Sequence, residues 1–153
     1  MITSILLLLS SAIFYCLPAA ESATDNRILV NEVEVNPPGN DSGGEEKVEL
    51  YNPSNNTTTT DISGWTLSST PGTATATIVI REGTTIPPKG YLVIQGDSQQ
   101  QWLDNDGEVV KLMDDSGMLI DSAGPFSDAA NDDKTWQRSP DGNKITGSFQ
   151  GLH

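Results

Sequence analysis

The 153-residue sequence is poor in the side chains that most often carry catalysis. It has one cysteine, Cys16, and one histidine, His153, which is the last residue. Nucleophilic catalysis by serine or cysteine usually needs a histidine beside the nucleophile, and this inventory offers no such pair. A hydrolase built on two carboxyl groups stays open, because acidic residues are plentiful. It would need one carboxyl group in an apolar pocket.

Positive charge is also scarce. Eight lysines and arginines stand against 21 aspartates and glutamates, for a formal net charge of -13. The basic residues are scattered singly along the chain, whereas binding to nucleic acid requires clusters that neutralise phosphates. We therefore expect no nucleic-acid partner. The acidic balance is typical of a solvated surface that keeps a protein in solution.

Long apolar runs are absent except at the start, where the chain reads MITSILLLLSSAIFYCLPAAES. The apolar stretch from Ile5 to Ala20 is shorter than the roughly 20 residues that span a bilayer, and Pro18 would interrupt a helix there. Residues 1–23 are predicted to be a cleaved signal peptide, so the protein would be secreted or held at the cell surface. An uncleaved membrane anchor is the alternative. Cleavage would remove Cys16, and the mature chain would fold without disulfides.

Helical periodicity is missing from the rest of the chain, and short apolar or alternating runs recur between turn signals rich in Pro, Gly, Asn and Asp. This pattern predicts an all-β domain over residues 24–142, a β-sandwich of about seven to nine strands. Residues 143–153 lose the pattern and are expected to form a loose tail. The expected strands are 28–35, 47–51, 65–69, 75–80, 91–95, 108–113, 118–122 and 134–138.

The stretch VELYNPSNNTTTTDISGW, residues 48–65, indicates where one strand should end and how the chain should continue after it. Val48 and Leu50 should share the buried face, and Asn52-Pro53 should end the ladder because proline offers no N–H. Thr57–Thr60 suit an exposed edge segment, since β-branched residues favour extended backbone. A glycosylated linker is the alternative reading of the threonines. Trp65 is expected to anchor the chain in the core.

The clearest local unit is EVVKLMDDSGMLIDS, residues 108–122. Two apolar runs flank Asp114-Asp115-Ser116-Gly117, which predicts a β-hairpin. We expect Val110, Leu112 and Leu119 to supply core contacts from its two strands.

Taken in order, NEVEVNPPG, VELYNPS, ISGWTL and TIPPKGYLVI resemble the lamin-tail domain family, in particular its exported prokaryotic members. The resemblance covers residues 28–142. It implies an immunoglobulin-like β-sandwich and no catalytic residues, because the family is known as a structural and interaction module.

Clustered acids suggest one candidate metal site. Asp104, Asp106 and Glu108, with Asp132 or Asp133, could offer oxygens to Ca²⁺ in a loop site, although no EF-hand register fits Gly107 or Gly117. The same residues are explained as turn formers. We expect no obligatory cofactor, with Ca²⁺ as the one candidate.

Two further kinds of surface site are predicted. Asn40, Asn55 and Asn56 match the N-x-[ST] glycosylation triplet in turns. Trp102, in the loop DSQQQWLDNDG, is a candidate contact residue, but burial in the core is the favoured interpretation because tryptophan buries a large area wherever it can. The combined prediction is a non-enzymatic exported interaction or tethering module of the cell surface, whose partner is a protein or glycan of the cell envelope. A membrane contact is expected only if the first segment is uncleaved. The alternatives are a calcium-dependent surface adhesion or binding protein and a carboxylate-based hydrolase.

Overall fold

The computed structural model describes residues 27–39, 46–70, 77–96, 102–143 and 145–151, the last range as backbone only. The predicted signal peptide, residues 1–23, lies outside this part of the chain. The described residues form eleven strands and no helix. The strands are β1 (Leu29–Glu34), β2 (Lys47–Tyr51), β3 (Thr60–Asp61), β4 (Thr66–Thr70), β5 (Thr77–Val79), β6 (Thr85–Ile86), β7 (Tyr91–Gln95), β8 (Asp106–Met113), β9 (Leu119–Ser127), β10 (Lys134–Arg138) and β11 (Ile145–Gly151).

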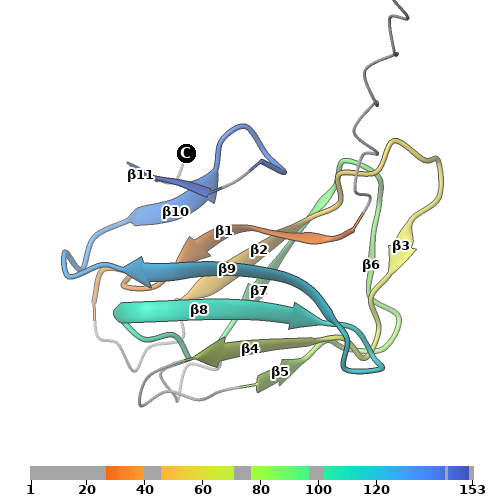
Figure 1. Cartoon of the computed structure of the whole chain (residues 1–153), viewed down its shortest axis with the longest axis horizontal. Coiled ribbons are helices and arrows are strands. Elements are labelled where there is room, and N and C mark those ends of the chain that lie inside the picture. Colours follow the sequence, from red (N-terminus) through yellow and green to blue (C-terminus); the bar gives the residue numbers. More distant parts are fainter. Residues whose placement is uncertain (1–26, 40–45, 71–76, 97–101, 144, 152–153) are drawn as a thin grey trace, which may run out of the picture.

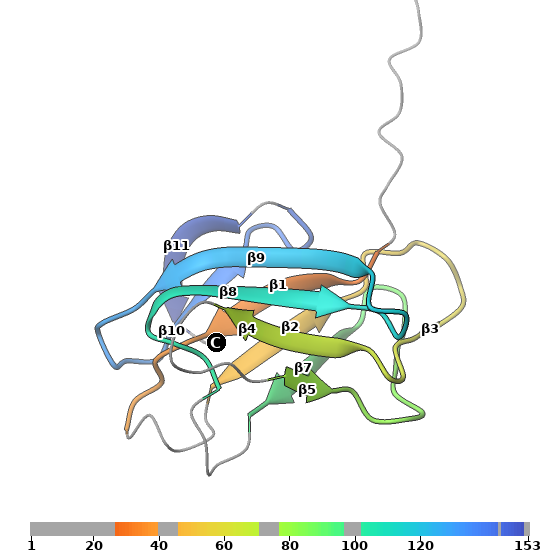
Figure 2. The ribbon, with the colours of Figure 1, turned by 60° about the horizontal axis from the view of Figure 1, so that its bottom comes forward.

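Two antiparallel sheets make up the body of the protein, as Figures 1 and 2 show. One sheet has the order β11-β10-β1-β2-β7 and the other has the order β5-β4-β8-β9. The short pair β3-β6 joins them at one end of the sandwich. Nine of the described strands therefore belong to the two main sheets. The prediction of an all-β, immunoglobulin-like sandwich is confirmed.

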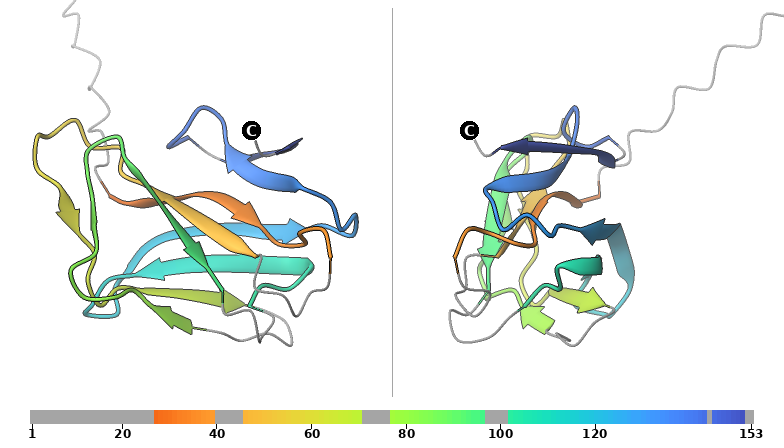
Figure 3. Two further views of the ribbon diagram at one scale, coloured as in Figure 1. Left: turned by 180° about the vertical axis from the view of Figure 1, so that it is seen from behind. Right: turned by 90° about the vertical axis from the view of Figure 1, so that its left-hand side faces the viewer.

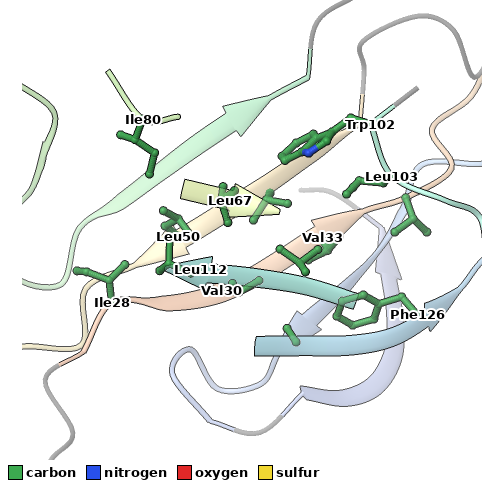
Figure 4. Packing of buried hydrophobic residues seen from close by; sticks show 14 of the residues in the cluster. Ile28, Val30, Val33, Leu50, Leu67, Ile80, Trp102, Leu103, Leu112 and Phe126 are labelled. Carbon is green, nitrogen blue, oxygen red and sulfur yellow. The ribbon is translucent and has the colours of Figure 1, made fainter. Parts of the chain in front are cut away.

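The core lies between the two sheets and is built by side chains at alternate strand positions (Figure 4). Val48 and Leu50 on β2 are fully buried, as their spacing predicts. Leu67 on β4 and Leu112 on β8 face them from the other sheet. The buried apolar cluster comprises Ile28, Val30, Val33, Val35, Val48, Leu50, Ile62, Leu67, Ile80, Ile86, Trp102, Leu103, Val110, Leu112, Ala123 and Phe126.

The exit from β2 also follows the sequence. The strand ends at Tyr51, and buried Asn52 donates from Nδ2 to the Ile86 carbonyl at 3.0 Å, which ties β2 to β6. Residues 55–59 are exposed, and strand β3 begins at Thr60. Trp65 is half-buried and packs against the core.

The eight expected runs all contain strands, but three differences stand out. Strand β3 begins at Thr60, the last residue of the expected edge segment, so residues 57–59 of that segment are not in a strand, and β6 has no sequence signal of its own. Residues 145–151 form β11, which pairs with β10, so the expected loose tail from 143 is wrong for this segment. Backbone pairing needs no apolar pattern, which explains why the sequence gives no signal there.

Within the hairpin of β8 and β9, Val110 and Leu112 are buried, but Leu119 is 53% exposed. The expectation for Leu119 is therefore wrong. The β8–β9 ladder shifts register between Leu112 and Met113, which changes the face that Leu119 occupies beside the turn.

One lateral side of the sandwich is closed by side chains. Asp121 on β9 accepts hydrogen bonds from the backbone N–H of Val30 on β1 at 2.8 Å and from Arg138 Nη2 on β10 at 3.0 Å. Arg138 Nε also donates to the Val30 carbonyl at 2.8 Å. The end strand of one sheet is thereby fastened to the other. A helix that is long and apolar enough to cross a membrane does not occur among the described residues.

Candidate functional site

The three acids predicted as a calcium site serve the loop that carries them. Glu108 is fully buried, and its Oε2 accepts the backbone N–H of Asp104 at 2.7 Å. Asp104 Oδ1 accepts the N–H of Asp106 at 3.2 Å, and Asp106 Oδ1 accepts the Ser127 hydroxyl at 2.8 Å. The described part of the chain has no group of three Asp, Glu, His or Cys residues arranged to hold a metal. Turn formation accounts for these contacts.

Trp102 belongs to the core. Its side chain is 2% exposed, and the adjacent backbone is fixed because the N–H groups of Trp102 and Leu103 both donate to Glu46 Oε2, at 2.7 and 2.9 Å. Trp102 is therefore a core residue, as the favoured interpretation of the sequence had it, and does not form a contact surface. Burial of the large indole ring removes much apolar surface area from water, which favours a core position for Trp102 over an exposed loop position.

The glycosylation triplets differ in what the structure says of them. Asn55 and Asn56 are exposed in the segment between β2 and β3, where an acceptor would be accessible. Asn40 lies outside the described residues. The three residues remain candidate glycosylation sites.

Four carboxyl groups are buried at one end of the sandwich, where β1 and β9 end and β2 and β8 begin. They are Glu34, Glu46, Glu108 and Asp128. Burial of these four carboxyl groups was not predicted from the sequence. For Glu108 the signal was present, since it has the same strand parity as buried Val110 and Leu112.

The carboxyl group of Glu34 has a raised pKa. Burial raises its pKa to about 7, nearby Lys47 opposes that shift, and Asp128 and Asp132 reinforce it. A raised pKa is what a carboxylate hydrolase would need. However, Glu34 is 1% exposed, and the buried Oε1 of Glu34 and Oδ2 of Asp128 have no hydrogen-bond partner among the described residues. A substrate has no access to the Glu34 carboxyl group in this arrangement.

Exposed apolar side chains occur on the lateral side opposite the closed one, on the outer faces of the two terminal strands. The large hydrophobic residues that are exposed in the described chain are Val79, Tyr91, Val93, Met118 and Leu119. Three of the five belong to β5 and β7, the terminal strands of the two sheets on this side. The left panel of Figure 3 views the molecule from behind, with β7 in front of the sheet that contains β4 and β5.

A groove of about 360 Å³ runs between these two strands. It is lined by residues 78–81 and 84 from β5 and the segment after it, and by residues 92–94 of β7. Ile78, Leu92 and Ile94 are half-buried within it. An apolar hollow beside unpaired strand edges is the kind of feature that binds another chain.

The first residue of β7 is held firmly. The Tyr91 ring stacks on Tyr51 with centroids 4.9 Å apart, and its hydroxyl donates to Asp141 Oδ2 at 2.6 Å. That hydrogen bond is the main cause that raises the pKa of Tyr91 to about 12. Strand β7 forms one wall of the groove, and its N-terminal end is therefore fixed by both stacking and hydrogen bonding.

The comparisons with known proteins agree with this architecture. The family model described as Lamin Tail Domain matches residues 21–127, which is more than two thirds of the chain and ends with β9. The search of curated proteins returned no match. The family is one of immunoglobulin-like domains and is not known as an enzyme family. This chain belongs to the lamin-tail domain family.

Proposed function

We propose that this protein is a non-enzymatic, exported binding module that tethers a protein or glycan of the cell envelope at the cell surface. The observation that carries the proposal is the apolar groove between β5 and β7, beside the open edge of a lamin-tail sandwich. Isolated exposed hydrophobic residues are common on proteins, but an apolar groove beside an unpaired strand edge indicates contact with another molecule.

The chemistry of the carboxyl groups supports a binding role over a catalytic one. Glu46 and Glu108 accept backbone N–H groups, and Asp128 accepts the N–H of Ala130 at 2.8 Å. These acids hold loops in place. The apolar leader at residues 1–23 supports export, since its length and composition are typical of signal peptides.

Photo-crosslinking in the producing cells tests the proposal. A photoreactive amino acid is placed at Val93, and in a separate variant at Met118, which is similarly exposed but lies at the turn between β8 and β9. We expect an extracellular protein whose mass corresponds to a start near residue 24, and a crosslinked envelope component with the Val93 probe but not with the Met118 probe. Retention of the protein inside the cell, or equal labelling from both positions, would refute this function.

Trp102→Ala separates the two surfaces that the sequence suggested. Because Trp102 is buried, the change should lower the free energy of unfolding by about 3 to 5 kcal/mol. If the variant instead keeps its stability and loses the crosslink, the contact surface is the loop that contains Trp102.

A further inference from the structure

We propose that β7 accepts an added strand from a partner protein, an extended segment with apolar side chains at alternate positions and one carboxylate that meets Arg81. The inference rests on the proposed binding function and names the partner's chemistry. The structure carries it through three features: the direction of the backbone groups of β7, the composition of its edge, and the groove beside it.

The backbone groups of β7 divide into two sets. Gly96 N–H donates to the Glu46 carbonyl at 3.2 Å, and Asn52 N–H donates to the Gly90 carbonyl at 3.0 Å. These contacts frame the regular β2–β7 register, in which Leu50 pairs with Leu92 and Val48 with Ile94. In an antiparallel ladder hydrogen-bonded pairs alternate with non-bonded ones.

It follows that Leu92 and Ile94 turn their N–H and C=O groups toward β2. Tyr91, Val93 and Gln95 turn theirs to the open edge. Because β7 ends the order of its sheet, these groups have no neighbouring strand in the described chain. Val93 stands at the centre of the open row.

The edge of β7 lacks the features that usually prevent strand addition. Natural edge strands are protected by charges, proline, bulges or short length. The sequence of β7, YLVIQ, has no charge and no proline, and its ladder with β2 has no register shift over five pairs. By contrast, β9 carries Asp121 and Pro125, and its ladder with β8 has three shifts.

The groove decides what an added strand would contain. Side chains on its inner face would enter the space beside Ile78, Leu92 and Ile94, so those positions should be apolar. Among the described residues that line the groove, Arg81 is the one with a charge, and it is exposed. A carboxylate on the partner would complement it.

A second copy of this chain fits less well. Its β7 has no carboxylate to offer Arg81, and each copy has a formal net charge of -13, so two copies repel each other. We therefore assign the groove to a segment of a different protein.

Peptide binding to the full chain tests this assignment. The probe is a short fluorescent peptide of alternating valine and threonine that ends in glutamate. Two control peptides are compared with it. One ends in lysine instead of glutamate, and the other has N-methylated backbone amides at the positions that would face β7. Fluorescence anisotropy should show binding of the glutamate peptide, weaker binding of the lysine peptide, and no binding of the N-methylated peptide.

Val93→Pro removes the central N–H of the open edge, and Val93→Thr keeps it. We expect Val93→Pro to weaken binding about tenfold or more, as loss of a hydrogen bond and blocked pairing require, while Val93→Thr stays within about twofold of the unchanged protein. Arg81→Glu should reverse the preference between the glutamate and lysine peptides. The N-methylated peptide keeps the test valid even if Val93→Pro lowers stability.

Equal affinity of the two Val93 variants, or full binding by the N-methylated peptide, would overturn the proposal. So would a dimer in light scattering that Val93→Pro abolishes, since the occupant would then be a second copy. If peptides fail while the crosslink to an envelope component persists, this inference fails and the proposed function stands. Loss of both would remove the function as well.

Discussion

The two lateral sides of the sandwich are finished by different means. On one side β9 lies against β1 and β10, and the Asp121 carboxylate meets both the Val30 N–H and the Arg138 guanidinium. On the other side β5 and β7 are terminal strands separated by an apolar groove. The first side has its polar groups paired across the sheets. The second leaves backbone groups and apolar side chains available.

The difference follows from where the ladder between β1 and β10 ends. Val30 lies opposite Leu50, which bonds to β7, so the backbone groups of Val30 turn away from β2 and toward β10. The ladder with β10 pairs Glu32 and Val33 but not Val30, and the side chains of Asp121 and Arg138 satisfy the Val30 N–H and C=O groups instead. The hydrogen bonds of the described residues show no counterpart of the Asp121 contact at the open edge of β7.

The largest expected effect comes from breaking the closed side. Asp121→Ala should lower the free energy of unfolding by about 3 to 5 kcal/mol, because it leaves Arg138 nearly buried without its carboxylate. Asp121→Asn keeps an acceptor for the Val30 N–H and should cost about 1 to 2 kcal/mol. Urea unfolding followed by circular dichroism measures both. A loss below about 0.5 kcal/mol for alanine would mean that the closed side is not held by this contact.

The carboxyl group of Glu34, beside Asp128 and Asp132 at the end of the closed side, should make stability depend on pH. Burial raises its pKa from 4.5 to about 7, so between these values the folded state holds a proton that the unfolded state releases. Stability therefore falls as pH rises through this window, by about 3 kcal/mol.

Glu34→Gln should remove that part of the pH dependence and leave the variant relatively more stable above pH 7. Thermal unfolding from pH 4 to 8 gives the comparison, with Glu32→Gln on the same strand as the matched control. Parallel curves for the unchanged protein and Glu34→Gln would refute the burial of this group.

The smallest expected effect belongs to the open side. Leu92 is half-buried at the groove, whereas Leu112 is fully buried in the core. Leu92→Ala should cost about 1 kcal/mol and Leu112→Ala about 3 kcal/mol, since the loss scales with the apolar area removed and the cavity left. Equal losses in denaturant unfolding would show that the groove is as well packed as the core.

Much of the fold was predictable because alternation reports local burial. Val48 and Leu50 face the core as their spacing indicates, and the turn at Asp114–Gly117 joins β8 to β9. The same alternation would have placed Glu108 on the buried face with Val110 and Leu112, although a charged side chain is usually found at the surface. Trp102 shows the converse, since a polar loop sequence surrounds a core residue.

The candidate site was not predictable in the same way. Which strand ends a sheet depends on pairings between distant segments, so the sequence of β7 does not state that its edge is open. The contact of Asp121 with Val30 joins residues 91 positions apart. Periodicity reports the face that a side chain occupies and is silent on long-range order.

Amide hydrogen exchange along β7 tests the central claim, that one side of the sandwich is open and the other closed. We predict protection of the Leu92 and Ile94 amides, which bond to β2, and rapid exchange at Val93 and Gln95. The Val30 amide should be protected by Asp121 and should lose that protection in Asp121→Ala. Uniform slow exchange along β7, or fast exchange at Val30 in the unchanged protein, would contradict the account.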